Sequence, residues 1–281
     1  ADSASQLAKH LGRNRVQQFN PADGVLLEHQ RQLQWITRLR EAIELGHFEL
    51  FYQPVVALQG NSEGLRYEVL LRYHDPLSGE WVSPGQFLGA AERYGFLGAI
   101  DRWVVMRLLQ WLADNPRHVQ QLQQVNFNLT ASSLLNAHFH EMLHSELLRH
   151  NLPAHKLCIE VTEMVALGEL GVSSQWIKQL RSLGLKVALD DFGSGFASYA
   201  YLRHLPLDIV KIDGSFISGL ENDPINQAMV GSMQQIASQL GLSTVAEFVE
   251  TQATLDCVRG LGLDYAQGYF IGHPQPLTQL S

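Results

Sequence analysis

The sequence has little of what marks a membrane span, a secreted protein or a basic nucleic-acid-binding surface. No run approaches the ~18 apolar residues of a membrane-spanning helix, and no segment resembles a signal peptide. Lysine and arginine number 20 against 28 aspartates and glutamates, a formal net charge of -8. This balance argues against sequence-independent binding to duplex nucleic acid. It does not exclude a small phosphorylated ligand, because bound metal ions reverse the local charge of an acidic pocket.

Cysteine is also scarce, and its placement excludes the common cysteine-based sites. Cys158 and Cys257 form neither a CxxC motif nor a metal-ligand spacing, so we expect small buried hydrophobes of a reducing compartment. Apolar residues make up 46% and charged residues 17% of the 281 positions, which is typical of a globular chain with a sizeable core. We therefore expect a cytoplasmic domain that makes no membrane contact of its own.

What the sequence does contain is a series of apolar runs with β character, most of them separated by amphipathic helical segments. The runs cover residues 48–56, 65–73, 124–129, 157–161, 186–189, 209–212, 244–249 and 265–271. Eight runs joined mainly by helical crossovers predict an α/β fold, a (β/α)8 TIM-like barrel. The first two runs are joined by the loop 60–64 alone, which is too short for a crossover helix. We therefore expect this first strand pair to be antiparallel.

Two adjacent carboxylates end the run that begins at residue 186. Asp190 and Asp191 are followed at once by a loop with Gly193 and Gly195, where the backbone turns sharply. Adjacent ionised carboxylates repel each other unless a cation or several donors compensate. Alternatively, an isolated Asp-Asp pair is a solvated strand end or a helix N-cap. The other strand ends must decide between these interpretations.

Polar side chains recur within or just after the other apolar runs. They are Glu68, Asn128, Glu160, Asp190, Asp191, Lys211, Glu247 and Gln267. Each alone has a structural interpretation, as an ion pair or a cap, but a barrel brings all strand ends to one face. Oxygen donors without histidine or cysteine favour Mg²⁺ or Mn²⁺, and two such ions roughly 3.5–4 Å apart clamp a phosphoester. A lysine that orients water and a glutamate that takes its proton then indicate phosphodiester hydrolysis.

The chain also closely resembles the EAL-domain family of bacterial cyclic-di-GMP phosphodiesterases. The matching stretches run in the family's order over about residues 30 to 281, and include 51–54, 68–72, 128–130, 159–163, 190–195, 211–213, 245–251 and 267–269. The resemblance implies metal ligation by Glu68, Asn128, Glu160, Asp190 and Asp191. It also implies that Lys211 holds the nucleophilic water, that Glu247 is the general base or reaches the second metal, and that Gln267 positions the water.

Further roles follow from the same resemblance. Gln53, Leu70 and Arg72 are expected to contact the dinucleotide, Arg72 through phosphate, while Glu163 and Glu250 support the site, Glu163 by anchoring the loop after Asp191. Family members open one phosphodiester of cyclic-di-GMP to give linear 5′-pGpG. They use two Mg²⁺ or Mn²⁺ ions, are inhibited by Ca²⁺, and often form homodimers. The alternative is a receptor domain that binds cyclic-di-GMP without hydrolysis and signals to a protein partner.

Four positions depart from the family's usual pattern. Val69 replaces alanine and Ser194 replaces threonine, both mild changes, whereas His273 stands where a basic side chain is usual. Phe248 replaces a glycine, and we expect its ring to crowd Glu247 and slow the reaction. Tyr199 and Tyr201, after the glycine loop, either stack on a base or pack in the core.

The first residues carry a second, weaker resemblance. Residues 1–2 and 8–16 are similar to the C-terminal helix of a GGDEF (diguanylate cyclase) domain. We therefore expect residues 1–30 to be the remnant of a preceding GGDEF domain with its linker, and residues 31–281 to form the EAL-type barrel. The full-length protein would then be a GGDEF–EAL tandem.

Overall fold

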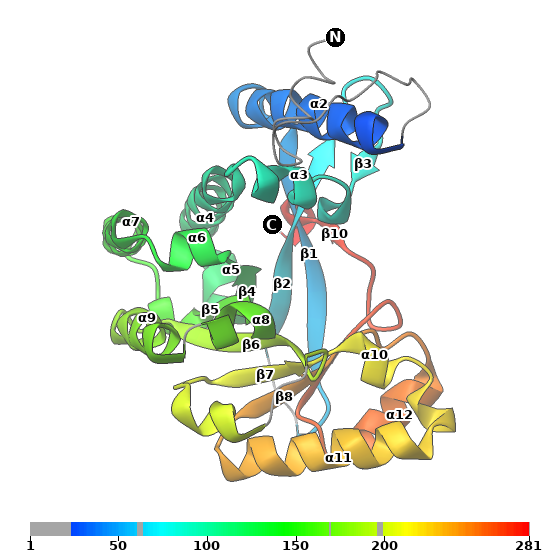
Figure 1. Cartoon of the computed structure of the whole chain (residues 1–281). Helices are drawn as coiled ribbons and strands as arrows, with labels where there is room; N and C mark the ends of the chain where they lie inside the picture. Colours follow the sequence, from blue (N-terminus) through cyan, green and yellow to red (C-terminus); the bar gives the residue numbers. More distant parts are fainter. Residues whose placement is uncertain (1–23, 61–63, 169, 196–198, 281) are drawn as a thin grey trace. The chain divides into compact units, whose positions relative to one another are not determined.

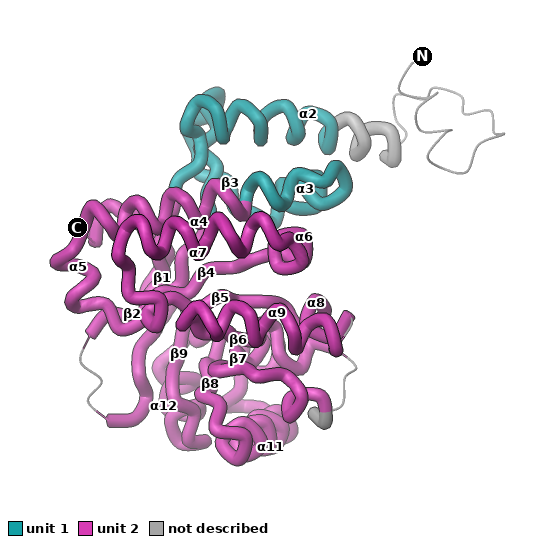
Figure 2. Tube along the Cα trace, turned by 90° about the vertical axis from the view of Figure 1, so that its left-hand side faces the viewer, with its two compact units in different colours: residues 1–49, 71–100 teal, residues 50–70, 101–281 magenta. Residues whose placement is uncertain are grey.

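The computed structural model describes residues 24–60, 64–168, 170–195 and 199–280. They belong to two compact units, coloured separately in Figure 2: residues 1–49 with 71–100, and residues 50–70 with 101–281. The helix expected from the GGDEF resemblance of residues 1–2 and 8–16 lies outside the described residues. Within the described ranges, no helix combines the length and the apolar character that crossing a membrane requires.

The first unit is built around an aromatic core. Its elements include α2 (Gly24–Leu45), β3 (Trp81–Val82), η1 (Pro84–Gln86) and α3 (Leu88–Arg93). Trp35 of α2 packs edge-on against Tyr73 at 5.4 Å between ring centroids, and Phe87 lies 5.6 Å from Trp35. Phe48 contacts both Tyr73 and Phe87. Phe87 lies between η1 and α3, and its buried ring belongs to this core.

The second unit contains the barrel (Figure 1). Eight of the described strands form it: β1 (Phe48–Ala57), β2 (Leu65–His74), β4 (Leu122–Asn128), β5 (Leu157–Thr162), β6 (Lys186–Phe192), β7 (Ile209–Ile212), β8 (Ser243–Ala246) and β9 (Tyr265–Gln267). Their order is β1-β9-β8-β7-β6-β5-β4-β2, and β1 also pairs with β2, which closes the barrel.

The direction of β1 distinguishes this barrel from an all-parallel one. Each pair from β2 through β4, β5, β6, β7 and β8 to β9 is parallel, whereas β1 is antiparallel to β9. Strand β1 is therefore also antiparallel to β2, which confirms the predicted barrel with its antiparallel first pair. Two short strands were not predicted: β3, beside β2, and β10 (Gln275–Pro276), beside β1.

Helices cover the outside of the barrel. They include α4 (Leu97–Asp114), α5 (Pro116–Gln121), α6 (Ala131–Leu134), α7 (Ala137–Arg149), α8 (Glu163–Gly168), α9 (Leu170–Ser182), α10 (Gly214–Ile217), α11 (Pro224–Gln239) and α12 (Gln252–Gly260). Helix α9 packs against β6 and α11 packs against β8 (Figure 1). The side chain of Asp223 caps α11 and that of Thr251 caps α12.

An apolar layer fills part of the barrel interior. Cys158, Ala188, Ile209 and Val245, one from each of β5, β6, β7 and β8, form a buried cluster. Side chains two residues apart on a strand share a face. The residues two positions later on these strands therefore also point inward, one layer closer to the carboxyl ends. This register places the site described next.

Candidate active site

The inward layer above this apolar layer is charged. Each of its four residues follows one of the four apolar residues by two positions, and all four are buried: Glu160, Asp190, Lys211 and Glu247. We use the term acidic cluster for Glu68, Glu160, Asp190, Asp191 and Glu247 together with Lys211, Asn128 and Gln267. All eight residues come from the second unit, and all were predicted from the strand ends.

Lys211 lies at the centre of the acidic cluster. Its side chain is 1% exposed, and its Nζ lies 2.9 Å from Glu160 Oε2 and 2.9 Å from Glu247 Oε1. The same nitrogen is 3.0 Å from Asp190 Oδ1 and 3.3 Å from Glu68 Oε2. One ammonium therefore bridges carboxylates from four different strand ends.

Amide side chains orient the carboxylates on the β2 side of the cluster. Asn128 donates from Nδ2 to Glu68 Oε1 at 2.8 Å, and a longer contact of 3.4 Å reaches Glu160 Oε2. Gln267 donates from Nε2 to Glu68 Oε2 at 2.8 Å and to Gln53 Oε1 at 3.2 Å. Gln53 in turn donates to the carbonyl of Gly272 at 3.1 Å. The predicted substrate residue Gln53 is thus connected to the cluster through Gln267.

Burial dominates the proton affinities in the cluster. It raises the pKa of Glu160 well above the usual range, and the neighbouring Glu68 adds to the rise. It also raises the pKa of Glu247 to about 8, which Lys211 opposes and Asp190 reinforces. For Lys211, burial disfavours the charge, but the four carboxylates raise its pKa well above its ordinary value. The structure therefore keeps the ammonium charged and Glu247 able to hold a proton near neutral pH.

Glu68 behaves differently from its neighbours. Burial works to raise its pKa, but the Lys211 ammonium and the hydrogen bond from Gln267 together hold the pKa below the usual value. Asp191 is half-buried, and its pKa is raised first by burial and then by Asp190. The pKa of Glu68 is thus lowered, whereas the pKa values of Glu160, Asp191 and Glu247 are raised.

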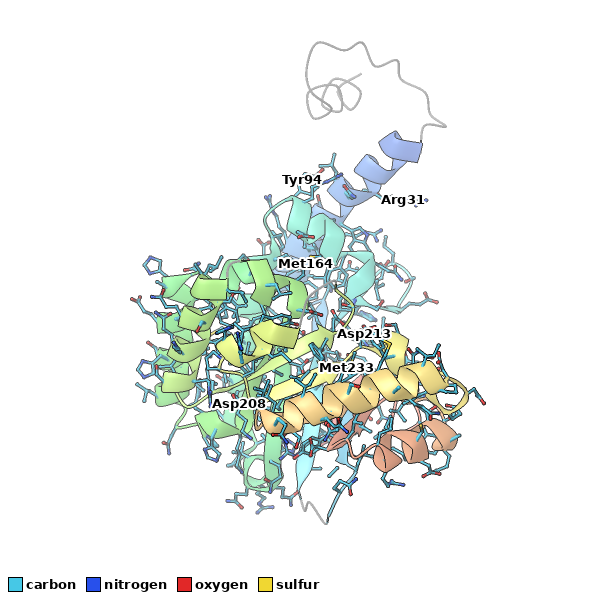
Figure 3. The ribbon with its side chains drawn as sticks, turned by 60° about the horizontal axis from the view of Figure 1, so that its bottom comes forward. Arg31, Tyr94, Met164, Asp208, Asp213 and Met233 are labelled. Carbon is cyan, nitrogen blue, oxygen red and sulfur yellow. The ribbon has the colours of Figure 1, made fainter. Side chains whose placement is uncertain are left out.

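The loop after Asp191 is held by Glu163, at the start of α8. Glu163 is buried, and it accepts hydrogen bonds from the Gly193 amide at 2.9 Å and from the Tyr201 hydroxyl at 2.6 Å. Gly193 has φ 97°, and a Cβ there would lie 2.9 Å from the methyl carbon of Met233, a residue of α11 that is labelled in Figure 3. These contacts are consistent with the expectation that Glu163 anchors the loop after Asp191. They also show that Tyr201, one of the two candidate stacking residues, packs in the core.

The donors of the acidic cluster fit a divalent cation. One carboxylate oxygen from each of Asp190, Asp191 and Glu247 lies within 4.8 Å of the others. Asp190 Oδ1 and Gln267 Oε1 are buried and accept no hydrogen bond within the described part of the chain, although Lys211 forms an ion pair with the former. Five carboxylates and one ammonium leave the cluster short of positive charge, and buried oxygens of this kind are ligands that Mg²⁺ and Mn²⁺ prefer.

For three further predicted site residues, the described contacts do not test the predicted role. Leu70 is half-buried on β2, and Glu250 is exposed. Arg72 belongs to the first unit, where its Nη1 donates to the Leu71 carbonyl at 2.7 Å. The roles of these three residues stay predictions.

Two buried residues were missed at the sequence level. Asn126 of β4 donates from Nδ2 to Glu160 Oε1 at 2.6 Å and accepts from Gln124 at 2.8 Å. It precedes Asn128 by two residues, so strand alternation would have placed it on the same face. Asp101 of α4 accepts from the amide and the hydroxyl of Thr130, at 3.0 and 2.6 Å. No local pattern points to that contact, because 29 residues separate the partners.

Phe248 does not crowd the cluster as expected. Its side chain is 60% exposed, while the neighbouring Glu247 stays buried at 2.9 Å from Lys211. Its backbone has φ 53°, in the left-handed region that favours glycine. This conformation accounts for the glycine that the family usually has at this position.

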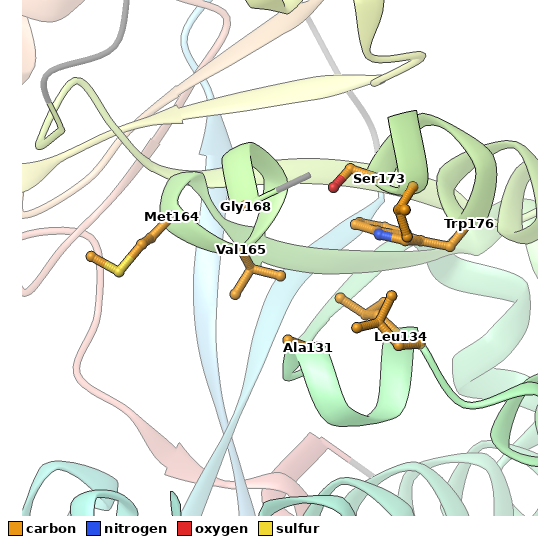
Figure 4. A pocket seen from close by; sticks show the side chains of 9 residues that line it. Ala131, Leu134, Met164, Val165, Gly168, Ser173 and Trp176 are labelled. Carbon is orange, nitrogen blue, oxygen red and sulfur yellow. The ribbon is translucent and has the colours of Figure 1, made fainter. Parts of the chain in front are cut away.

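A separate pocket of about 480 Å³ lies between α6, α8 and α9 (Figure 4). Ala131, Leu134, Val165 and Trp176 are among the side chains that line it, and Met164 lies at its edge. The lining is mostly apolar and contains none of the residues of the acidic cluster. Its chemistry therefore differs from that of the cluster.

Comparison with known proteins agrees with this fold. The family model for the EAL domain matches residues 36–274, and the chain therefore belongs to the EAL-domain family. It is 39% identical over 278 residues to the cyclic di-GMP phosphodiesterase PdeB of Shewanella oneidensis, covering 99% of this chain and 32% of that protein. It is 36% identical over 242 residues to the cyclic di-GMP phosphodiesterase PdeF of Escherichia coli, covering 86% of this chain and 32% of that protein. The chain thus spans about a third of the length of these relatives.

Solved structures show the same fold. The PaMucR phosphodiesterase in complex with c-di-GMP superposes with a TM-score of 0.78 at 35% identity, covering 88% of this chain and all of that one. The FimX EAL domain from Pseudomonas aeruginosa bound to c-di-GMP gives a TM-score of 0.79 at 31% identity, covering 86% and 96% of the two chains.

Proposed function

We propose that this chain is a cyclic-guanylate-specific phosphodiesterase that hydrolyses cyclic-di-GMP to linear 5′-pGpG. The observation that carries the proposal is Lys211, buried among Glu68, Glu160, Asp190 and Glu247 at the carboxyl ends of the barrel strands. The names of the relatives and of the ligand-bound EAL structures support the choice of substrate.

In the proposed reaction, the oxygen of a water attacks phosphorus while the bond from phosphorus to the 3′ oxygen breaks. Lys211 directs the water by donating from Nζ, and Glu247 takes the water's proton at Oε2, the oxygen that is not paired with Lys211. The 3′ oxygen leaves and takes up a proton from solvent water, so that the phosphate stays on the 5′ side. Gln267 orients Glu68 by its hydrogen bond, and Gln53, Leu70 and Arg72 bind the dinucleotide.

We propose that Glu68, Asn128, Glu160, Asp190 and Asp191 hold two Mg²⁺ or Mn²⁺ ions, and that Ca²⁺ inhibits. Bound there, the ions would supply positive charge that activates water, offsets the phosphate charge and keeps the carboxylates ionised. The Asp190 Oδ1, which accepts no hydrogen bond within the described residues, and the group of Asp190, Asp191 and Glu247 support this proposal. Glu163 and Glu250 would act as supporting residues.

Incubation of the purified chain with cyclic-di-GMP tests the function directly. With Mg²⁺ or Mn²⁺ we expect pGpG to accumulate, as followed by chromatography. With EDTA, or with Ca²⁺ as the sole divalent ion, we expect no pGpG. Glu247→Gln should lose product formation, whereas Glu141→Gln, an exposed carboxylate of α7, should behave as the parent. Tight binding of cyclic-di-GMP without product under either metal would contradict the enzyme and favour a receptor that signals to a protein partner.

The organisation of the full-length protein is a further part of the proposal. Residues 1–30 would be the end of a preceding GGDEF domain with its linker, and residues 31–281 the EAL barrel. A bifunctional diguanylate cyclase/cyclic di-GMP phosphodiesterase, MucR of Pseudomonas aeruginosa, aligns with the whole of this chain at 36% identity, which supports the tandem.

Two free cysteines, Cys158 buried and Cys257 half-buried, support a cytoplasmic location for this domain. The homodimer expected from the family resemblance is tested by the solution mass.

A further inference from the structure

The segment that carries Glu247 leaves the β-sheet before it reaches the cluster. Strand β8 ends at Ala246, and residues 247–250 have no regular secondary structure. Glu247 and Val249 are both buried, while Phe248 between them is exposed. The position of Glu247 therefore depends on contacts other than a strand ladder.

One side of this segment is fastened to β9. The Val249 amide donates to the Gln267 carbonyl at 3.0 Å, and the Phe270 amide donates to the Val249 carbonyl at 3.1 Å. On the other side, the Glu247 amide donates to the Ile212 carbonyl of β7 at 3.3 Å, a long hydrogen bond. The attachment toward β7, the strand of Lys211, is thus the weaker of the two.

Phe248 supplies a second attachment on that weaker side. Its side chain packs directly on Gly214, a buried residue that follows Lys211 by three positions at the start of α10. A Cβ on Gly214 would lie 2.6 Å from Phe248 Cγ and 2.9 Å from Phe248 Cβ, which is closer than side chains approach. Only glycine at position 214 leaves room for the ring.

Phe248 carries two costs that a glycine would avoid. Its φ of 53° is unfavourable for a bulky residue, and this aromatic residue is 60% exposed. Strain of this kind at a catalytic face is an observation from which a functional role can be inferred. The packing of the Phe248 ring on Gly214 offsets these two costs.

We propose that Phe248 is a positioning residue: its ring, packed on Gly214, holds residues 247–249 in the bend that directs Glu247 toward Lys211. The proposal rests on the proposed function, in which Glu247 takes the proton of the attacking water. It reverses the expectation that this phenylalanine slows the enzyme.

A double-mutant cycle tests the proposal with Phe248→Gly, Gly214→Ala and the combination. Phe248→Gly removes the ring and relieves the backbone, so we expect kcat to fall by roughly 3- to 10-fold while KM and Tm stay near the parent values. Gly214→Ala should lower kcat by roughly 10-fold in the parent and by less than about 2-fold when Phe248 is already glycine. Phe248→Tyr keeps the ring and should retain the parent kcat.

Two outcomes would overturn the proposal. One is a Phe248→Gly protein whose kcat equals or exceeds that of the parent. The other is a Gly214→Ala effect of the same size in both backgrounds. If the parent chain forms no pGpG, the proposed function fails by itself, and thermal unfolding of the same four proteins still decides on the contact. Gly214→Ala should then lower Tm more in the parent than beside Phe248→Gly, and equal shifts would contradict the contact.

Discussion

The two units use opposite kinds of interior. In the first, Trp35, Phe48, Tyr73 and Phe87 bury aromatic surface in edge-on and tilted contacts at 5.4–6.2 Å. In the second, Lys211 and its carboxylates occupy the barrel interior, with charges removed from water. Aromatic burial stabilises a fold by itself, whereas a buried charge network costs desolvation that its own attractions offset only in part.

The difference separates stability from function. Truncating an aromatic residue leaves a cavity, and the cost follows the volume removed. In the acidic cluster, the cost depends on which sign of charge is removed, because five carboxylates share one ammonium. Removing a carboxylate should leave the free energy of unfolding near the parent value and abolish turnover. Removing the ammonium should lower both the free energy of unfolding and turnover.

The largest expected effect is on turnover. Glu247→Gln keeps the size of the side chain and its contact with Lys211 but cannot take a proton from water, so we expect kcat to fall by roughly 10²- to 10⁴-fold. The free energy of unfolding should not decrease, because the amide of glutamine is uncharged, as is the protonated Glu247 that burial favours near neutral pH. Turnover by chromatography and urea unfolding check the two parts, with calorimetric binding of cyclic-di-GMP as the control for folding. Parent-like turnover would assign the base to another residue.

Lys211→Met should cause the largest loss of stability. It leaves Glu68, Glu160, Asp190 and Glu247 without their shared partner, and breaking a buried ion pair in this way costs about 3–5 kcal/mol. Lys186→Met is the matched control, because Lys186 donates to the neutral Gln124 side chain and should cost about 1 kcal/mol. Urea unfolding of both proteins in EDTA makes the comparison. Equal losses for the two lysines would show that charge pairing contributes little.

Phe87→Ala should break the aromatic core of the first unit. Phe87 is fully buried against Trp35 and Phe48, so truncation should lower the free energy of unfolding by about 3 kcal/mol. Leu77→Ala removes a side chain that is 84% exposed and should change it by less than about 0.5 kcal/mol. Unfolding can be followed by the fluorescence of Trp35, the tryptophan in contact with Phe87. An unchanged midpoint for Phe87→Ala would argue that this core does not limit stability.

The smallest expected effect concerns pH in the absence of metal. Because the folded pKa of Glu247, about 8, exceeds the unfolded value, the folded state binds more protons, and stability falls as pH rises between the two values. From about pH 6 to about pH 7.5 we expect the parent to lose roughly 2 kcal/mol relative to Glu247→Gln, which lacks this titration. Urea unfolding in EDTA at several pH values gives the difference. Parallel curves for the two proteins would place the folded pKa of Glu247 near its unfolded value.

Local patterns in the sequence were enough to predict the barrel and most of its site. Apolar runs of β character located the eight strands, and polar side chains within or just after them identified the acidic cluster. The predicted runs 244–249 and 265–271 were too long. The strand predicted over 244–249 is interrupted by Phe248, whose backbone is left-handed. The strand predicted over 265–271 stops at Gln267, whose carbonyl accepts a hydrogen bond from the Val249 amide.

By itself, the sequence determined which residues are strands, which faces are polar and which chemistry their side chains can perform. Only the tertiary structure decided which atoms meet. Lys211 reaches Glu68 across 143 residues and Gln267 reaches Gln53 across 214, distances in the chain that no local pattern spans. The contact of Phe248 with Gly214 is of the same kind, since it exists only because β7 and β8 are neighbours. Periodicity reports the preference of a single strand, whereas barrel closure sets the distances between strands.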